Sequence, residues 1–278
     1  MSNISNLLSR ARGNFAPLVM GVLNVSRDSF SDGGKYSDDA SAVARAAEML
    51  REGADIIDIG AESTRPDATA LSAEDELALL LPRLKAVRAA FADVPISVDT
   101  YKGEVARIAL ENGADIVNDV FVKVEGGRCA TAAAAAEFGC PIVLTHNCRG
   151  ESGGGDFFAS LVCGLGEKIS AAEAEGVPRE NIVLDPGFGF GKTVAQNFEA
   201  VARLGELRVL GCPILLGVSR KSSLGAVVGG DMDLRDDSTA AVSALATFAK
   251  SVDILRVHNV AKNVAAIKTA SEILKWTK

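Results

Sequence analysis

Eight short apolar runs of this sequence each end in polar residues whose chemistry suits a ligand better than a hydrophobic core. The residues at the run ends are Asn24, Glu62 with Ser63, Asp99, Asn118 with Asp119, His146, Asp185, Ser219 to Lys221, and Arg256 with His258. Carboxylate and amide oxygens accept hydrogen bonds from N–H groups, whereas arginine, lysine and histidine can bind anions. The series therefore predicts a ligand site that offers both acceptors and cations.

The spacing of the runs indicates how the fold brings these residues together. The predicted strands are 17–25, 54–60, 95–99, 114–118, 141–145, 181–185, 213–218 and 253–257. Segments rich in Ala, Leu, Glu and Lys at helical spacing separate them. This repeated alternation predicts a (β/α)₈ TIM barrel, in which the carboxyl ends of the strands build the active site. We expect one barrel domain over 17–278, preceded by an N-terminal extension over 1–16.

Composition limits the classes of partner. With 29 Lys and Arg against 36 Asp and Glu, the formal net charge is −7, so no overall basic field exists to hold nucleic acid or an anionic membrane surface. No apolar run approaches the roughly 20 residues of a membrane-spanning helix. The five cysteines include no Cys-x-x-Cys pair, which favours reduced thiols in a cytoplasmic protein.

Asp99, Asn118 and Asp185 end three different predicted strands, so a barrel points all three towards one mouth. Three converging acceptors suit a heterocycle with several N–H donors, such as the edge of a guanine or a pterin. For Asp99 alone, a cap on the following helix is an equally good interpretation.

Cations gather after the last two predicted strands, which is the usual anion-binding position of this barrel. Arg256 and His258 are two residues apart and therefore on one side of a strand. With Asn24 at the end of the neighbouring first strand, they form a candidate anion clamp whose two basic residues we expect to be cationic. Arg220 has two possible roles at this stage: it could bind an anion, or it could pair with a carboxylate of the protein.

Three loop segments have separate predicted roles. The glycine-rich stretch 187–193 is not a P-loop, because the glycine required five positions before its Gly-Lys pair is Pro186. We expect it to present the Asp185 carboxylate and backbone amides, with little side-chain bulk in the way. The long polar segments 26–38 and 62–73 follow the first two strands, and we expect them to close over a substrate.

Seven segments, taken together and in order, closely resemble the dihydropteroate synthase family of the folate pathway. They are NVSRDSFSDGG at 24–34, DIGAESTRP at 58–66, SVDT at 97–100, VND at 117–119, LDPGFGFGK at 184–192, SRKS at 219–222 and RVH at 256–258. The resemblance implies a homodimeric pterin-binding barrel. It also implies the condensation of 6-hydroxymethyl-7,8-dihydropterin diphosphate with para-aminobenzoate, which yields dihydropteroate and diphosphate.

By the matched positions, the resemblance implies a role for each site residue. The residues that would bind the pterin are Asp99, Asn118, Asp185, Lys221 and Arg256, and those that would be catalytic are Lys221, Arg256, His258 and Asp99. The diphosphate would be held by Asn24, Thr64, Arg256 and His258, with Mg²⁺ near Asn24. The para-aminobenzoate would be framed by Phe30, Pro66, Phe190 and Ser222, while Asp32 and Arg65 would order the two long loops.

Several positions depart from the family pattern. Thr145 and Asn147 replace methionines on either side of His146, Ser26 and Arg27 replace a threonine and a proline, Ser223 replaces an apolar residue, and Asn259 replaces an aspartate. These departures favour, as the main alternative, a pterin-binding paralogue with weak or no activity. A methyltransferase barrel that passes a methyl group from methyltetrahydrofolate to a corrinoid shares the acidic edge. It would not need the 28–34 loop, Lys221 with Ser222, or the anion clamp.

Overall fold

The computed structural model describes residues 16–25, 38–64, 68–124, 126, 128–149 and 155–277, and strands and helices alternate along these ranges. The strands are β1 (Leu18–Asn24), β2 (Ile56–Gly60), β3 (Ile96–Asp99), β4 (Ile116–Asp119), β5 (Ile142–Thr145), β6 (Ile182–Asp185), β7 (Leu215–Leu216) and β8 (Ile254–Val257). The α-helices are α2 (Asp39–Glu52), α3 (Ala73–Ala90), α4 (Gly103–Glu111), α5 (Ala130–Phe138), α6 (Phe157–Ala174), α7 (Val194–Ala202), α8 (Ser222–Val228), α9 (Met232–Phe248) and α10 (Val260–Leu274). Two 3₁₀ helices, η1 (Arg179–Asn181) and η2 (Leu204–Leu210), complete the series.

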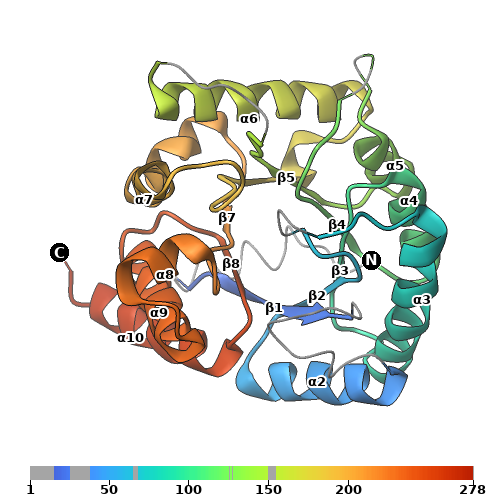
Figure 1. The fold of residues 1–278 in the computed structure, drawn as a ribbon, viewed down its shortest axis with the longest axis horizontal. Helices are drawn as coiled ribbons and strands as arrows, with labels where there is room; N and C mark the ends of the chain where they lie inside the picture. The colour runs from blue at the N-terminus through green and yellow to red at the C-terminus, as the bar shows by residue number, and fades with distance from the viewer. Residues whose placement is uncertain are drawn as a thin grey trace.

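The strands form a parallel sheet that curls into a ring, with the helices outside it (Figure 1). Their order is β6-β5-β4-β3-β2-β1-β8-β7. A parallel bridge between Leu184 and Ile214 joins β6 to the residue before β7 and closes the ring. The predicted TIM barrel is therefore confirmed. The seventh strand is shorter than the predicted 213–218, because its ladder with β8 covers only Leu215 and Leu216.

Local chemistry sets the ends of the helices. Gly53 and Gly139 cap α2 and α5 with positive φ values of 105° and 60°, a conformation in which glycine avoids a Cβ clash. Thr193 and Gln196 form a capping box that begins α7 directly after the glycine-rich loop. Among the described residues, none of the helices combines the length and apolarity that a membrane span requires.

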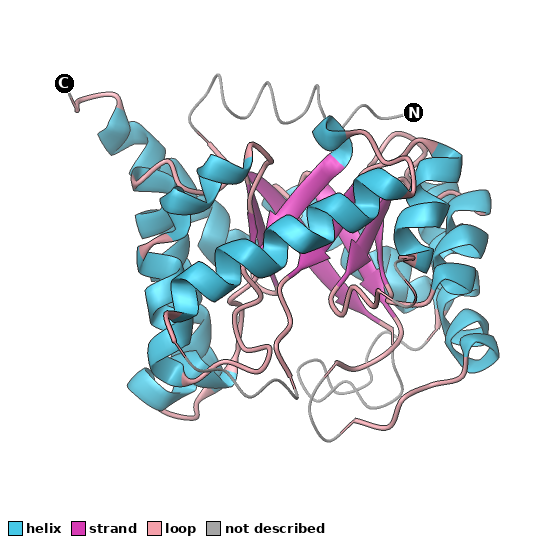
Figure 2. Cartoon of the chain, turned by 90° about the horizontal axis from the view of Figure 1, so that it is seen from above, coloured by secondary structure: helices cyan, strands magenta, loops and turns pink. Residues whose placement is uncertain are grey.

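Figure 2 shows the strands in the middle of the molecule with helices on either side of them, and the buried side chains form two core zones within this arrangement. The larger zone lies between the strands and the helices. The smaller zone fills the inside of the barrel and consists of Leu18, Met20, Ile56, Ile116, Val143, Val183, Leu215 and Ile254. Because side chains alternate along a strand, the residues two positions further along also face the inside, and these are mostly polar. The inside of the barrel thus has an apolar layer nearer the amino ends of the strands and a polar layer at their carboxyl ends.

Candidate active site

The polar layer inside the barrel contains charged and amide side chains from different strands. Asp58, Asn118, Asp185 and Arg256 each lie two residues beyond an apolar interior residue, so alternation turns all four to the same interior. The three acidic or amide side chains are at most 5% exposed. The fold therefore brings Asn118, Asp185 and Arg256 to one mouth, as their positions at strand ends predict.

Arg256 is held by two carboxylates. Its Nε donates to Asp58 Oδ2 at 2.6 Å, and its Nη2 donates to Asp99 Oδ2 at 2.5 Å. Asn118 Nδ2 donates to the same Asp58 oxygen at 3.3 Å. Burial disfavours the charged guanidinium, but the attraction of Asp58 and Asp99 outweighs it and raises the pKa of Arg256. Arg256 is therefore a charge-balanced cation whose planar group is fixed in place.

The two carboxylates that bind Arg256, from Asp58 and Asp99, have roles that the sequence did not predict with certainty. Asp99 is not the cap of the following helix, because the N-cap position of α4 is Lys102. Burial raises the pKa of Asp99 to about 7, although the charge of Arg256 acts in the opposite direction. Sequence reasoning missed Asp58 as a site residue. A charged residue inside an apolar strand was the available signal, since a buried charge requires a partner.

Asp185 and Lys221 bring a second pair of opposite charges to the mouth. Asp185 Oδ1 accepts a hydrogen bond from Gly187 N at 2.7 Å, and Lys221 Nζ donates to the backbone oxygen of Phe188. Burial raises the pKa of Asp185, and the charge of Lys221 is the largest opposing influence. Burial lowers the pKa of Lys221 to about 7, although Asp185 acts in the opposite direction. Lys221 thus changes its charge near neutral pH.

His258 follows β8 and is an uncharged imidazole at neutral pH. Its Nδ1 lies 2.9 Å from Ser219 Oγ, and its backbone N donates to the same oxygen at 3.1 Å. Burial, together with the charges of Arg220 and Arg256, lowers the pKa of His258 to about 3. The expectation of two cations at this clamp is therefore wrong for the ligand-free protein. Arg256 carries the charge, and His258 offers a neutral ring.

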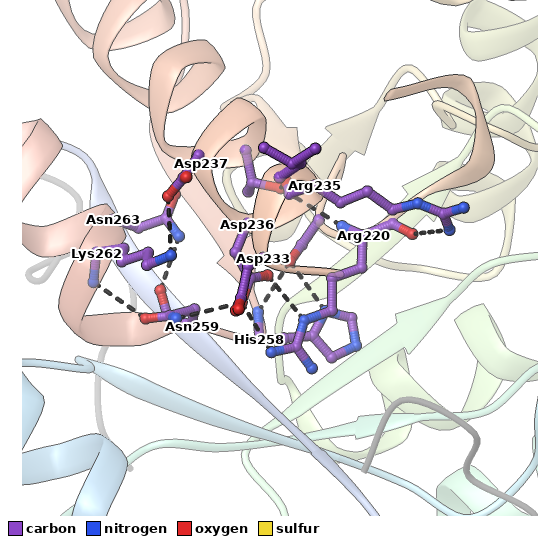
Figure 3. Close-up of polar contacts among 12 residues, drawn as sticks. Arg220, Asp233, Arg235, Asp236, Asp237, His258, Asn259, Lys262 and Asn263 are labelled. Atoms are coloured by element: carbon purple, nitrogen blue, oxygen red, sulfur yellow. Dashed lines mark hydrogen bonds and ion pairs between the residues drawn. The ribbon is translucent and has the colours of Figure 1, made fainter. Parts of the chain in front are cut away.

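Arg220 is engaged in an ion pair beside His258 (Figure 3). Its Nε and Nη2 donate to the two carboxylate oxygens of Asp236 at 2.8 and 2.9 Å. Asn259 Nδ2 donates to Asp236 Oδ2 at 3.2 Å. The backbone of Arg220 has a φ of 59°, so the chain turns sharply at this point. Of the two roles left open for Arg220, the structure shows the ion pair.

The predicted para-aminobenzoate residues divide between the described and the undescribed parts of the chain. Phe190 is buried, with Arg149 Cζ at 4.9 Å and Lys221 Nζ at 4.2 Å from its ring centroid. Ser222 is exposed and begins α8. Arg149 Nη1 also donates to the backbone oxygen of Thr64 at 2.7 Å, which connects the segments after β5 and β2. Phe30, Asp32, Arg65 and Pro66 lie outside the described residues, so their roles stay predictions.

Asn24 is the predicted metal-binding residue. It ends β1 and is half-buried, and alternation from Met20 places its side chain on the inside of the barrel. Its amide oxygen is a hard ligand of the kind that Mg²⁺ accepts, and Mg²⁺ commonly takes its other ligands from substrate phosphate and water. In the described part of the chain, no three His, Cys, Asp or Glu side chains are grouped to hold a metal ion.

The glycine-rich loop after β6 uses its backbone amides within the protein. The N–H groups of Gly187, Gly189 and Phe190 donate to protein oxygens at 2.7, 2.6 and 3.1 Å. A Cβ at position 187 would lie 1.9 Å from the backbone oxygen of His146, so only glycine fits there. At these three positions the backbone amides therefore stabilise the loop itself, whereas the sequence predicts that they face a ligand.

Comparison with known proteins agrees with this geometry. The family model of pterin binding enzymes matches residues 20–258. The dihydropteroate synthase of Streptococcus pyogenes serotype M3 is 44% identical over 264 residues, which cover 94% of this chain and 97% of that protein. The chain belongs to the dihydropteroate synthase family. It is therefore an enzyme of the transferase class.

Solved structures of dihydropteroate synthases share the barrel. The enzyme from Clostridium difficile, crystallised in the presence of pteroic acid, superposes with a TM-score of 0.86 at 40% identity, over 93% of this chain and 97% of that one. The enzyme from Xanthomonas albilineans in complex with 7,8-dihydropteroate gives a TM-score of 0.82 at 38% identity, over 95% of each chain.

The positions that depart from the dihydropteroate synthase pattern have different surroundings. Asn147 Nδ2 donates to the backbone oxygen of Val120 at 3.0 Å, and Ser223 Oγ accepts from Asn197 Nδ2 at 2.9 Å. Asn259 donates to Asp236, as described above. Thr145 Oγ1 is buried and has no hydrogen-bond partner among the described residues. Ser26 and Arg27 lie outside the described residues.

His146, whose role the sequence leaves open, points away from the dihydropteroate synthase site. Ile142 and Leu144 of β5 belong to the outer core, so alternation also turns His146 outwards. A Cβ at Gly164 of α6 would lie 3.0 Å from His146 Nε2, which shows that the ring packs against that helix. Burial lowers the pKa of His146 to about 3. The residue is therefore a neutral ring packed between β5 and α6.

Proposed function

We propose that this chain condenses 6-hydroxymethyl-7,8-dihydropterin diphosphate with para-aminobenzoate to give 7,8-dihydropteroate and diphosphate. The observation that carries the proposal is the bridge from Asp58 through Arg256 to Asp99, with Asn118 bonded to it. This bridge places several hydrogen-bond acceptors and a planar cation at one barrel mouth. The ligands in the two solved relatives, pteroic acid and 7,8-dihydropteroate, support the same substrate class.

The pterin-binding roles follow from which atoms face the barrel interior. The Asn118 amide nitrogen is turned to Asp58, so its oxygen is the atom that accepts a pterin N–H. Asp185 supplies a second, buried acceptor. Lys221 donates to the carbonyl and ring-nitrogen side of the heterocycle, and Arg256 stacks on the ring. Together these groups orient the exocyclic carbon that reacts.

The diphosphate is the leaving group, and its departure is the step that requires help. The bond between the exocyclic carbon and the diphosphate oxygen breaks, and the electron pair stays with the diphosphate. Arg256 and His258, with Asn24 and Thr64, hold the oxygens on which the charge develops. The electron-rich pterin shares the positive charge left on carbon, which favours a dissociative path. The pKa of His258, about 3 in the ligand-free protein, makes this residue a neutral hydrogen-bonding group before the diphosphate binds.

A Mg²⁺ ion near Asn24 would neutralise part of the diphosphate charge when bound. Asn24 fits this role because it offers an amide oxygen at the end of β1, next to β8, which carries Arg256. The ion is expected to arrive with the substrate, since most of its ligands are phosphate oxygens and water.

The second substrate attacks from the outer part of the mouth. The amine lone pair of para-aminobenzoate forms the new C–N bond, and the proton leaves the resulting ammonium to solvent or diphosphate, so no activating base is needed. Phe190 provides an aromatic wall, and Ser222, with Phe30 and Pro66, completes the pocket. The family resemblance gives Asp32 and Arg65 the role of ordering the two long loops, and both residues lie outside the described ranges.

We further propose a homodimer in the cytoplasm. Large apolar side chains are exposed on the neighbouring helices α9 and α10 and just beyond α10, namely Leu245, Phe248, Ile273 and Trp276. Such surfaces commonly form subunit interfaces. The five cysteines are free thiols, which supports a reducing compartment. Light scattering after size exclusion tests the dimer, and a Leu245→Glu variant should shift it to monomer.

The decisive experiment measures diphosphate release from the pterin diphosphate with and without para-aminobenzoate. Release that depends on the amine, with dihydropteroate formed in equal amount, is the expected result. A Lys221→Ala variant should bind the pterin more weakly and lose turnover. Tight pterin binding without product in the unmodified protein would instead identify a non-catalytic paralogue and refute the proposal.

A further inference from the structure

Thr145 lies on the strand between two predicted pterin-binding residues. It is the last residue of β5, and β5 lies between β4, which carries Asn118, and β6, which carries Asp185. In the register of β5 with β6, Thr145 is the direct partner of Asp185. Val143, two residues earlier, belongs to the interior apolar cluster, so alternation turns the Thr145 side chain into the barrel.

The Thr145 hydroxyl is buried without a partner. The residue is 0% exposed, and its Oγ1 has no hydrogen-bond partner among the described residues. A Cβ at Gly187 would lie 3.1 Å from Thr145 Cγ2, so the methyl group packs against the turn after β6. A buried hydroxyl without a hydrogen bond destabilises a protein, and native proteins contain few of them. The hydroxyl therefore requires an explanation, and a ligand in the barrel mouth supplies one.

Three other polar side chains that follow β5, β7 and β8 form hydrogen bonds within the protein. Asn147, two residues after Thr145, donates to the backbone oxygen of Val120 at 3.0 Å. Ser223 and Asn259, near the ends of β7 and β8, bond to Asn197 and Asp236 at 2.9 and 3.2 Å. These three polar groups stabilise the ligand-free fold. Thr145 contributes no such bond among the described residues and instead places an adaptable donor and acceptor beside Asp185.

We propose that the Thr145 hydroxyl hydrogen-bonds the bound pterin between Asn118 and Asp185, and is a further residue that determines substrate affinity and specificity. The inference rests on the proposed function, because it assumes a pterin in this mouth. It extends the polar edge, which β4 and β6 supply through Asn118 and Asp185, to β5 between them. A heterocycle with a nitrogen or N–H at this edge is thereby favoured over one with a C–H.

The test uses variants that separate the hydroxyl from the shape of the side chain. Thr145→Val keeps the branched shape and removes the hydroxyl, whereas Thr145→Ser keeps the hydroxyl and removes the methyl group. The probe is 6-hydroxymethylpterin, titrated by calorimetry into the intact protein. We expect Thr145→Val to weaken binding about fivefold and Thr145→Ser to change it less than about twofold. Thermal melting of the ligand-free protein gives a second readout, in which Thr145→Val should raise Tm by about 2–4 °C.

Ser97 provides a matched control. Its hydroxyl is also buried and without a partner among the described residues, but its register partner on β4 is Ile116 of the apolar layer, below the mouth. Ser97→Ala should therefore leave pterin binding unchanged.

Two results would overturn the role of Thr145. One is unchanged binding in Thr145→Val, and the other is equal weakening by the Val and Ser variants, which would assign the effect to shape. Failure of the unmodified protein to bind the pterin would instead refute the proposed function. A loss of affinity in Asp185→Asn together with unchanged affinity in Thr145→Val would refute this inference alone.

Discussion

Arg256 Nε lies 2.6 Å from Asp58 Oδ2, and this contact joins β8 to β2 across the intervening β1. The same guanidinium reaches Asp99 on β3 at 2.5 Å. Two carboxylates therefore fix the plane of the guanidinium before a substrate arrives. A pterin that stacks on this plane does not have to order a flexible side chain, so binding loses less conformational entropy.

Asp58→Asn is expected to destabilise the protein and to weaken pterin binding. The substitution leaves a buried guanidinium with one carboxylate instead of two, and loss of one partner of a buried pair costs about 3 kcal/mol. Urea unfolding should show this loss as a lower midpoint with an unchanged slope. Calorimetric titration should show weaker binding of 6-hydroxymethylpterin, because the stacking plane is no longer fixed.

Two control variants separate stability from binding in this experiment. Asp253→Asn removes a buried carboxylate that accepts from Ile214 N at 2.8 Å and pairs with Arg208 at 3.2 Å, at the opposite ends of the strands. It should lower stability without changing pterin affinity. Asp237→Asn breaks an exposed pair with Lys262 and should cost less than about 1 kcal/mol. An unchanged urea midpoint in Asp58→Asn would contradict the structural role of the bridge.

Lys221 should make the stability of the protein rise with pH above neutrality. Burial lowers its pKa from 10.5 to about 7 in the folded state. Below pH 7 the side chain is charged in both states, so the full burial penalty applies. Between about pH 7 and 10.5 the unfolded chain binds more protons than the folded one, so the free energy of unfolding increases with pH.

The measurement compares the unmodified protein with Lys221→Met in urea at pH 6.5, 8 and 9.5. The comparison removes the contributions of the other titrating groups, since both proteins share them. The stability advantage of Lys221→Met should be largest at pH 6.5 and should shrink as the pH rises. An advantage that stays constant with pH would show that Lys221 keeps its charge in the folded protein.

The apolar runs predict the barrel because strands that are covered on both faces consist almost entirely of apolar residues, which is easily recognised in the sequence. The ends of those runs also predict that Asn118, Asp185 and Arg256 share one mouth, since the geometry of the barrel fixes where strand ends meet. The partners of Arg256 could not be predicted in the same way. Asp58 is 198 residues away in sequence, and the choice among several acidic residues depends on the shear of the closed sheet.

Side-chain contacts that depend on how the helices pack could not be predicted from the sequence either. Arg220 pairs with Asp236 because α9 packs beside the turn after β7, and no local pattern indicates that docking. The charge state of His258 also required the structure, because burial and the nearby arginines together set its pKa. The residue type determines which charges and hydrogen bonds a side chain can offer. Packing determines its partner and its charge state, as at Arg220 and His258.

Asn259→Asp is expected to destabilise the network beside His258, although the family pattern has aspartate at this position. In this chain Asn259 Nδ2 donates to Asp236, and a carboxylate there would lie close to a second one. The loss should be about 1 kcal/mol at pH 7 and should disappear at low pH, where one carboxyl is protonated. Asn259→Ser provides the control, because it removes the donor but keeps a side chain that can cap α10. Equal stability of the Asp variant and the unmodified protein in urea at pH 7 would refute this account.

Mg²⁺ should bind this protein together with diphosphate and only weakly without it. Asn24 supplies one amide oxygen at the end of β1, and a Mg²⁺ ion usually completes its six ligands with phosphate oxygens and water. Titration of MgCl₂ into the ligand-free protein should therefore give little heat. Addition of Mg²⁺ should tighten the binding of inorganic diphosphate by about tenfold or more, and EDTA in excess should abolish both this gain and turnover. In Asn24→Ala the gain should shrink while the binding of 6-hydroxymethylpterin persists, since the pterin edge lies on other strands. Undiminished activity in excess EDTA would remove the metal from the mechanism.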